Sequence, residues 1–148
     1  MPTVKALSET FFSTFEALKA ELEALLPADR YADIRIPLEH GNVFRATGKL
    51  DRMYRNAADT KTLGRLAHEW RVAQEVIRND TTLFGEELTK MLAIARKKFD
   101  DDLHQQLDFI SSLSSIRSRW HRLMKNGGGA KNVGDLLRQT ALKDHTTE

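Results

Sequence analysis

Apolar residues recur at every third or fourth position from Phe84 to Met124, and the segment contains no proline. The positions are Phe84, Leu88, Met91, Leu92, Ala95, Phe99, Leu103, Leu107, Ile110, Leu113, Ile116, Trp120, Leu123 and Met124. This spacing predicts one very long helix that buries a single face. At about 1.5 Å per residue, such a helix is roughly 60 Å long, longer than a compact domain of this size is wide. We therefore expect the face to need a partner, either the rest of this chain or another chain.

The weakest part of this predicted helix is the segment Ser111–Ser115, which contains four serines. Serine side chains compete for backbone hydrogen bonds and favour helices less than the neighbouring residues do. The pattern leaves open whether residues 84–124 form one helix or two helices that meet at a bend.

Three shorter helices are predicted by the same spacing. The first covers residues 4–26 and is ended by Pro27, the second covers 42–58, and the third covers 62–79. Residues 28–41 lack a clear period and contain Pro37 and Gly41, so we expect a structured loop there, with one helical turn or a short strand as the alternatives.

These elements predict an all-α fold, a bundle of four to five helices over residues 1–126 with one very long C-terminal helix. Three glycines, at 127–129, end the helical pattern because glycine both caps and destabilises helices. Residues 127–148 are therefore expected to form a Gly-rich hinge and a short tail helix at about 132–142. In the bundle, Trp120 is expected to pack in the core against the first helix.

Composition restricts the chemistry available to the chain. Its 148 residues are enough for a hydrophobic core without disulfides or metal, and it has no cysteine. No apolar run reaches membrane-spanning length, and the N-terminal residues lack the apolar segment of a signal peptide. We therefore expect a cytoplasmic protein that does not contact a membrane.

No residue pattern predicts a catalytic or metal site. The five histidines are scattered, and no two of them lie three or four residues apart on one helix face. The serines and threonines show no recognisable nucleophile motif. The sequence therefore predicts a protein that is not an enzyme, with no metal and no cofactor.

Basic residues form two stripes opposite apolar helix faces, and these are the candidate nucleic-acid-binding residues. The first stripe is Arg45, Lys49 and Arg52, and the second is Arg117, His121 and Lys125, with Arg122 beside it. Such stripes suit the regular phosphate spacing of a nucleic-acid backbone. No exposed aromatic residue is expected among them, so the predicted contacts are to the backbone rather than to stacked bases.

Within residues 62–80, the pattern Leu66-Ala67-x4-Val72-Ala73-x2-Val76-Ile77-Arg78-Asn79-Asp80 resembles the helix-turn-helix of DeoR-type repressors. The resemblance implies sequence-specific DNA binding through these residues. Arg71 stands where the turn usually has glycine or asparagine, and Leu63, Trp70 and Ile77 also fit one uninterrupted helix. A continuous helix is the favoured interpretation.

The sequence thus favours a non-enzymatic small helical subunit of a larger cytoplasmic assembly that touches nucleic-acid backbone through its basic faces. One alternative is a protein-interaction module without nucleic acid, of the secretion-chaperone or anti-activator type, whose long apolar face binds a partner helix. The second alternative is a helix-turn-helix regulator acting through residues 62–80. Neither the partner nor the choice between DNA and RNA follows from the sequence.

Overall fold

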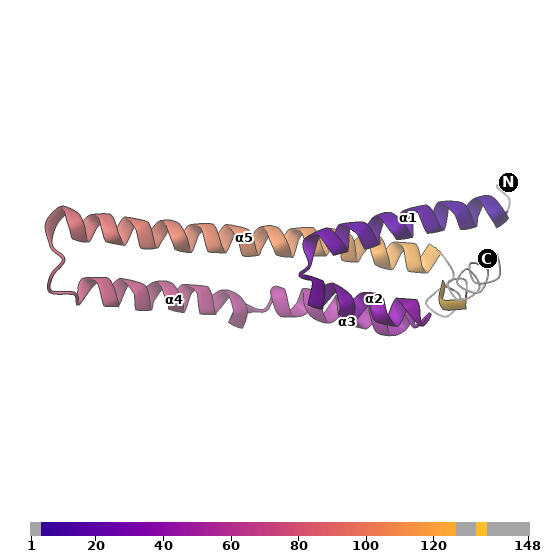
Figure 1. Ribbon diagram of the computed structural model, residues 1–148, viewed down its shortest axis with the longest axis horizontal. Helices are drawn as coiled ribbons and strands as arrows, with labels where there is room; N and C mark the ends of the chain where they lie inside the picture. Colours follow the sequence, from indigo (N-terminus) through magenta and orange to yellow (C-terminus); the bar gives the residue numbers. More distant parts are fainter. Residues whose placement is uncertain (1–3, 127–132, 136–148) are drawn as a thin grey trace. The chain divides into compact units, whose positions relative to one another are not determined.

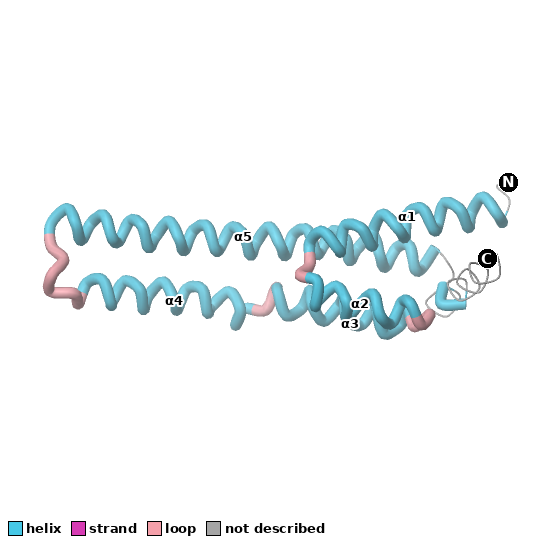
Figure 2. The backbone as a smooth tube through the Cα atoms, in the orientation of Figure 1, coloured by secondary structure: helices cyan, strands magenta, loops and turns pink. Residues whose placement is uncertain are grey.

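The chain is all-α, as predicted. The computed structural model describes residues 4–126 and 133–135, and these contain helices and turns without a strand (Figures 1 and 2). The helices are α1 (Val4–Leu25), α2 (Ala28–Glu39), α3 (Val43–Ala57), α4 (Thr60–Arg78) and α5 (Gly85–Asn126). The long C-terminal helix is α5, which has 42 residues and runs through Ser111–Ser115 as one element. The choice between one helix and two is therefore decided in favour of one.

The prediction of a loop at residues 28–41 is wrong, because most of this segment forms α2. Its buried residues Tyr31, Ile34 and Leu38 follow helical spacing, whereas the alternation of Ile34 and Ile36 had resembled a strand. Pro27 occupies the position before the first helical residue, and Pro37 lies in the last turn, so only two further residues of the helix follow it. The burial of one face against the other helices outweighs the prolines.

The described chain divides into two compact units. Unit 1 draws on residues 1–54 and 112–148, and unit 2 consists of residues 55–111. Helices α3 and α5 each contribute residues to both units. The predicted boundary between a bundle at 1–126 and a tail at 127–148 stays a prediction, since residues 127–132 and 136–148 lie outside the described part. Of the predicted tail, residues 133–135 are helical, and Val133 is completely buried.

Unit 1 contains almost all of the buried core. Most of its buried apolar side chains come from four helices: Phe11, Phe15, Leu18 and Leu22 of α1, Tyr31, Ile34 and Leu38 of α2, Val43, Ala46, Leu50 and Met53 of α3, and Leu113, Ile116, Trp120 and Met124 of α5. Trp120 is fully buried, with its ring 5.4 Å from that of Phe15. This contact confirms the predicted packing of Trp120 against the first helix.

Unit 2 is an antiparallel pair of helices made by α4 and residues 85–111 of α5, which we call the α4–α5 hairpin (Figure 1). The rings of Trp70 and Phe99 stack across it with centroids 5.8 Å apart. No residue of α4 is buried, and the stripe from Leu88 to Ile110 is half-buried or exposed. The sequence predicted a buried face along the whole of α5, but this face is buried only from Leu113 onwards.

Candidate nucleic-acid interface

A tight connection between α2 and α3 places the first basic stripe. Gly41 has a φ of 74°, and the amides of Gly41 and Asn42 donate to the carbonyls of Leu38 and Pro37, at 3.0 and 2.8 Å. This pattern is the Schellman motif that ends many helices. The Asn42 side chain then accepts a hydrogen bond from the amide of Arg45 at 3.0 Å and caps α3. Three residues therefore separate the end of α2 from the start of α3, which runs back beside it.

Arg45, Lys49 and Arg52 lie along one flank of α3, beside its buried face, and we call these three the α3 basic face. Their spacing of four and three residues puts them on one edge of the helix. Arg45 and Arg52 are exposed, and Lys49 is half-buried. Among the residues that the structure describes, none of the three side chains forms an ion pair or a hydrogen bond with another residue. Their charges are therefore available to an outside partner.

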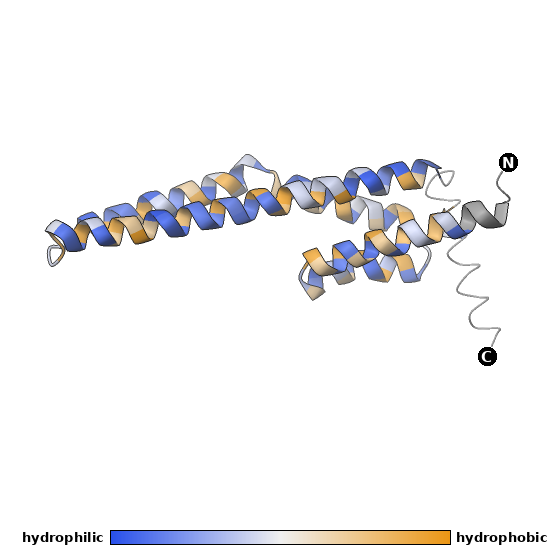
Figure 3. Cartoon of the chain, turned by 90° about the horizontal axis from the view of Figure 1, so that it is seen from above, coloured by the Kyte–Doolittle hydropathy of each residue, from blue (hydrophilic) through white to orange (hydrophobic). Residues whose placement is uncertain are grey.

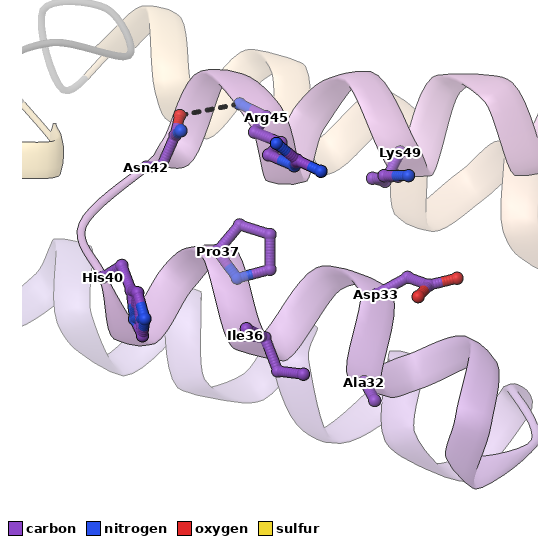
Figure 4. A pocket seen from close by; sticks show the side chains of 8 residues that line it. All are labelled: Ala32, Asp33, Ile36, Pro37, His40, Asn42, Arg45 and Lys49. Carbon is purple, nitrogen blue, oxygen red and sulfur yellow. Dashed lines mark hydrogen bonds between the residues drawn. The ribbon is translucent and has the colours of Figure 1, made fainter.

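A groove between α2 and α3 borders this face (Figure 4). Its volume is about 350 Å³, and it is lined by Ala32, Asp33, Ile36, Pro37, His40, Asn42, Arg45 and Lys49. Arg45 and Lys49 are the two permanent cations in the lining, and Asp33 is its one carboxylate. The groove thus has an apolar floor with an excess of positive charge on the α3 side.

Phe44 is the functional candidate that the sequence analysis missed. It is 81% exposed on α3, directly before Arg45, although no exposed aromatic residue was expected near the basic stripes. Phe44, Gly48 and Arg52 follow one another at intervals of four residues, and a Cβ added at Gly48 would meet nothing within 4 Å. The sequence could have indicated this exposure, because Phe44 does not lie on the helix face formed by Val43, Ala46 and Leu50. The Phe44 ring therefore has open space beside it next to a cation.

The second basic stripe is partly neutralised within unit 1. Arg117 Nε donates to Asp51 Oδ1 at 2.7 Å, and His121 Nε2 lies 2.7 Å from the same oxygen. The Arg117 guanidinium also lies 5.0 Å from the centre of the Tyr54 ring. These contacts link α5 to α3 in the bundle, so a phosphate would have to compete with Asp51 for both side chains.

These contacts lower the pKa of the Asp51 carboxyl group. Burial raises its pKa, but the hydrogen bonds and charges of His121 and Arg117 outweigh burial and leave the pKa below its ordinary value. Asp51 therefore remains ionised over a wider pH range and holds its two partners.

The remaining basic residues near the end of α5 differ in their contacts. Arg119 donates to both carboxylate oxygens of Glu21, at 2.6 and 2.9 Å, and so belongs to the α1–α5 packing. Arg122 and Lys125 are exposed, and neither forms an ion pair with another described residue. The structure thus places the seven predicted residues on two helices, with the α3 basic face free and Arg117 and His121 engaged. Their nucleic-acid role stays a prediction.

Helix α4 contains the segment that resembles a helix-turn-helix. It runs from Thr60 to Arg78 without a break, as expected for a continuous helix. The Asp59 side chain caps it by accepting a hydrogen bond from the amide of Lys61 at 2.9 Å. Residues 62–80 therefore contain no second helix at the sharp angle that a recognition helix requires.

Two further features bear on the class of protein. Within residues 4–126 and 133–135, no three histidine, aspartate or glutamate side chains gather in an arrangement that could hold a metal ion. No helix among the described residues combines the length and apolar character needed to cross a bilayer.

Comparisons of this chain with models of protein families, with curated proteins and with solved structures find no match.

Proposed function

We propose that this chain is a non-enzymatic helical subunit of a larger assembly that contacts the backbone of a nucleic acid through the α3 basic face. The observation that carries the proposal is the contrast between the two basic stripes. Arg117 and His121 are held by Asp51, whereas Arg45, Lys49 and Arg52 have no partner among the described residues. Each phosphate that binds such a cation releases counterions, and this release favours binding.

Three phosphate contacts provide modest affinity. Non-specific binding to nucleic acid has a dissociation constant of about 10⁻⁴ to 10⁻⁶ M at physiological salt. Such affinity suits a subunit that is held in an assembly by protein contacts and adds nucleic-acid contacts of its own. A cytoplasmic location belongs to the same proposal.

The exposed ring of Phe44 favours a single strand over a duplex. A base of a single strand can stack on an aromatic side chain while the flanking phosphates meet nearby cations. Phe44 directly precedes Arg45, and the open position at Gly48 leaves room for a base beside the ring. The bases of a duplex are already stacked and cannot use the ring in this way.

Charge reversal of the α3 basic face tests the proposal. The triple substitution Arg45→Glu, Lys49→Glu and Arg52→Glu is expected to weaken oligonucleotide binding equally for all sequences. It should flatten the salt dependence of the binding constant by about two to three units, because each lost phosphate contact removes about one. Binding is measured by fluorescence anisotropy at several salt concentrations.

Two control variants make the result specific. Arg65→Glu, Arg71→Glu and Arg78→Glu on α4 change the net charge by the same amount and should leave most of the binding intact. Asp33→Asn removes the carboxylate from the groove and should strengthen binding. If the α4 triple variant abolishes binding to one preferred sequence while the α3 variant binds normally, the α3 proposal is wrong. Circular dichroism should show that both triple variants remain folded, because exposed substitutions usually change stability by less than about 0.5 kcal/mol.

A separate experiment tests Phe44. Phe44→Ala should weaken binding to a single-stranded oligonucleotide by roughly 5- to 150-fold, since stacking of one base contributes about 1–3 kcal/mol. Binding to a duplex of the same sequence should change little. An equal loss on both substrates would assign Phe44 to general packing of the interface and would contradict the single-strand preference.

A protein-interaction module without nucleic acid is the second candidate function. The observation that favours it is the exposure of apolar side chains on the α4–α5 hairpin, where Val76 is 66% exposed and Ile94 is 54% exposed. Absence of oligonucleotide binding at low salt would leave this candidate as the better one.

A further inference from the structure

The two flanks of the α4–α5 hairpin differ in character. Leu88, Leu92, Ala95 and Phe99 of α5 form the seam that faces α4, as the stacking of Phe99 on Trp70 shows. On one flank, the Arg96 guanidinium lies over both rings, 5.7 Å from Trp70 and 5.9 Å from Phe99, and Asp100 accepts a hydrogen bond from it at 3.2 Å. A charged pair therefore covers this side of the aromatic contact.

The opposite flank carries apolar side chains that nothing in the described chain covers. At about 100° per residue, Met91 and Ile94 lie on the side of α5 away from Arg96, and they are 41% and 54% exposed. Because α4 runs antiparallel to α5, the same geometry places Val76, which is 66% exposed, on this flank as well. Figure 3 shows that apolar and hydrophilic positions alternate along both helices of the hairpin. A pair of helices alone cannot bury this flank.

The order of residues along this flank is self-complementary. Glu87, Met91, Ile94 and Lys98 follow one another at intervals of four, three and four residues and so share one edge of α5. The sequence of intervals is symmetric, with an acid at one end, a base at the other and two apolar residues between them. Glu87 and Lys98 are both exposed, and neither forms an ion pair with another described residue.

We propose that this edge, defined by Glu87, Met91, Ile94 and Lys98, binds the same edge of a second copy of the chain in an antiparallel orientation. A two-fold axis midway between Met91 and Ile94 brings each Glu87 to the Lys98 of the other copy. The same axis places Met91 of one copy against Ile94 of the other. The two hairpins then form a four-helix arrangement, in which Val76 adjoins the buried centre. Self-complementarity of this kind is what a two-fold interface requires.

The size of the hairpin is sufficient for such an interface. Helix α4 has 19 residues, so the hairpin face is about 28 Å long, and two helices side by side are about 20 Å wide. This projected area of roughly 560 Å² underestimates the accessible surface and approaches the ~800 Å² per partner of a standard interface. A second copy is favoured over an unrelated helix because the charges of the edge match their own two-fold image.

The oligomeric state of the full chain tests the proposal in the absence of nucleic acid. Sedimentation velocity from about 1 μM to about 200 μM is expected to show a reversible monomer–dimer equilibrium within that range. Ile94→Lys should raise the dissociation constant by about 100-fold, because it removes two apolar contacts at the centre of the dimer. The matched control is Leu107→Lys. Leu107 is 46% exposed on the flank that carries Arg96, so its replacement should leave the dimer unchanged.

Charge exchange tests the antiparallel orientation. Glu87→Lys and Lys98→Glu should each raise the dissociation constant by about tenfold, because each produces two like-charge contacts in the dimer. The double variant restores both ion pairs and should return the constant to within about threefold of the original. If a single substitution acted only by altering the fold of the monomer, the second substitution would not restore the dissociation constant.

Each possible result bears on the proposal. A chain that stays monomeric over the whole concentration range overturns it. Dimers that withstand Ile94→Lys, dissociate with Leu107→Lys, or fail to recover in the double charge variant overturn this interface. None of these results depends on nucleic-acid binding, so they leave the proposed function of the α3 basic face untouched.

Discussion

Trp120→Ala is expected to lower the free energy of unfolding by about 3–5 kcal/mol, the usual range for removing a large aromatic side chain from a core. Trp120 is completely buried, and it contacts Phe15 of α1 while its Nε1 donates to Thr47 Oγ1 of α3 at 2.9 Å. The substitution therefore removes contacts among three helices and leaves a cavity between them. Urea unfolding followed by circular dichroism measures the loss.

Two variants separate the parts of this effect. Thr47→Val keeps the shape but leaves the indole N–H without its acceptor, and it should cost about 1–3 kcal/mol. Trp70→Ala changes the other tryptophan, which is only half-buried in the hairpin, and should cost less than Trp120→Ala. Equal losses for the two tryptophans would contradict the placement of the main core around Trp120.

Asp51→Asn is expected to lower the free energy of unfolding by about 1–2 kcal/mol near neutral pH, the range of hydrogen bonds to a charged group in a partly exposed position. The Asp51 side chain is 24% exposed, and its Oδ1 lies 2.7 Å from both Arg117 Nε and His121 Nε2. The asparagine variant retains the size of the side chain but loses the charge that holds the two partners. Glu21→Gln is the matched control. It weakens the Arg119 pair, whose carboxylate is 44% exposed, and should cost at most about 1 kcal/mol.

The contribution of Asp51 should depend on pH in a defined direction. Its pKa is lower in the folded protein than in the unfolded chain, so the unfolded state binds a proton first as the pH falls. The stabilisation is therefore complete above the unfolded value of about 4 and is lost as the pH falls through the lower, folded pKa. The difference in stability between the original chain and Asp51→Asn should be full at about pH 5 and should decrease steadily as the pH is lowered below about 4. A difference that persists at the lower pH would contradict this role of the carboxylate.

Local sequence determined the helical class of this protein and the position of most of its helices. The apolar spacing along α5 is long and unbroken, so one periodicity dominates, and the serines at 111–115 did not interrupt it. Trp120 falls at the expected place on the same stripe, and its burial follows directly. The α3 basic face was also found from spacing, because Arg45, Lys49 and Arg52 share one edge of their helix.

Other features depended on contacts between distant residues. Residues 28–39 form a helix because Tyr31, Ile34 and Leu38 are buried against other helices, and local propensity around two prolines carries no information about that burial. The second basic stripe looked equivalent to the first in sequence. The difference arises from Asp51, which is 66 residues from Arg117 along the chain.

By itself, the sequence determined that the chain forms helices and which face of each helix is apolar, because these properties follow from a repeat of three to four residues. Only the tertiary structure decided which of those faces are covered. One apolar stripe on α5 is buried from Leu113 onwards and remains partly exposed over residues 85–111, where a single helix lies against it. The reason is physical: periodicity records what a helix can bury, whereas burial depends on how many other helices surround it.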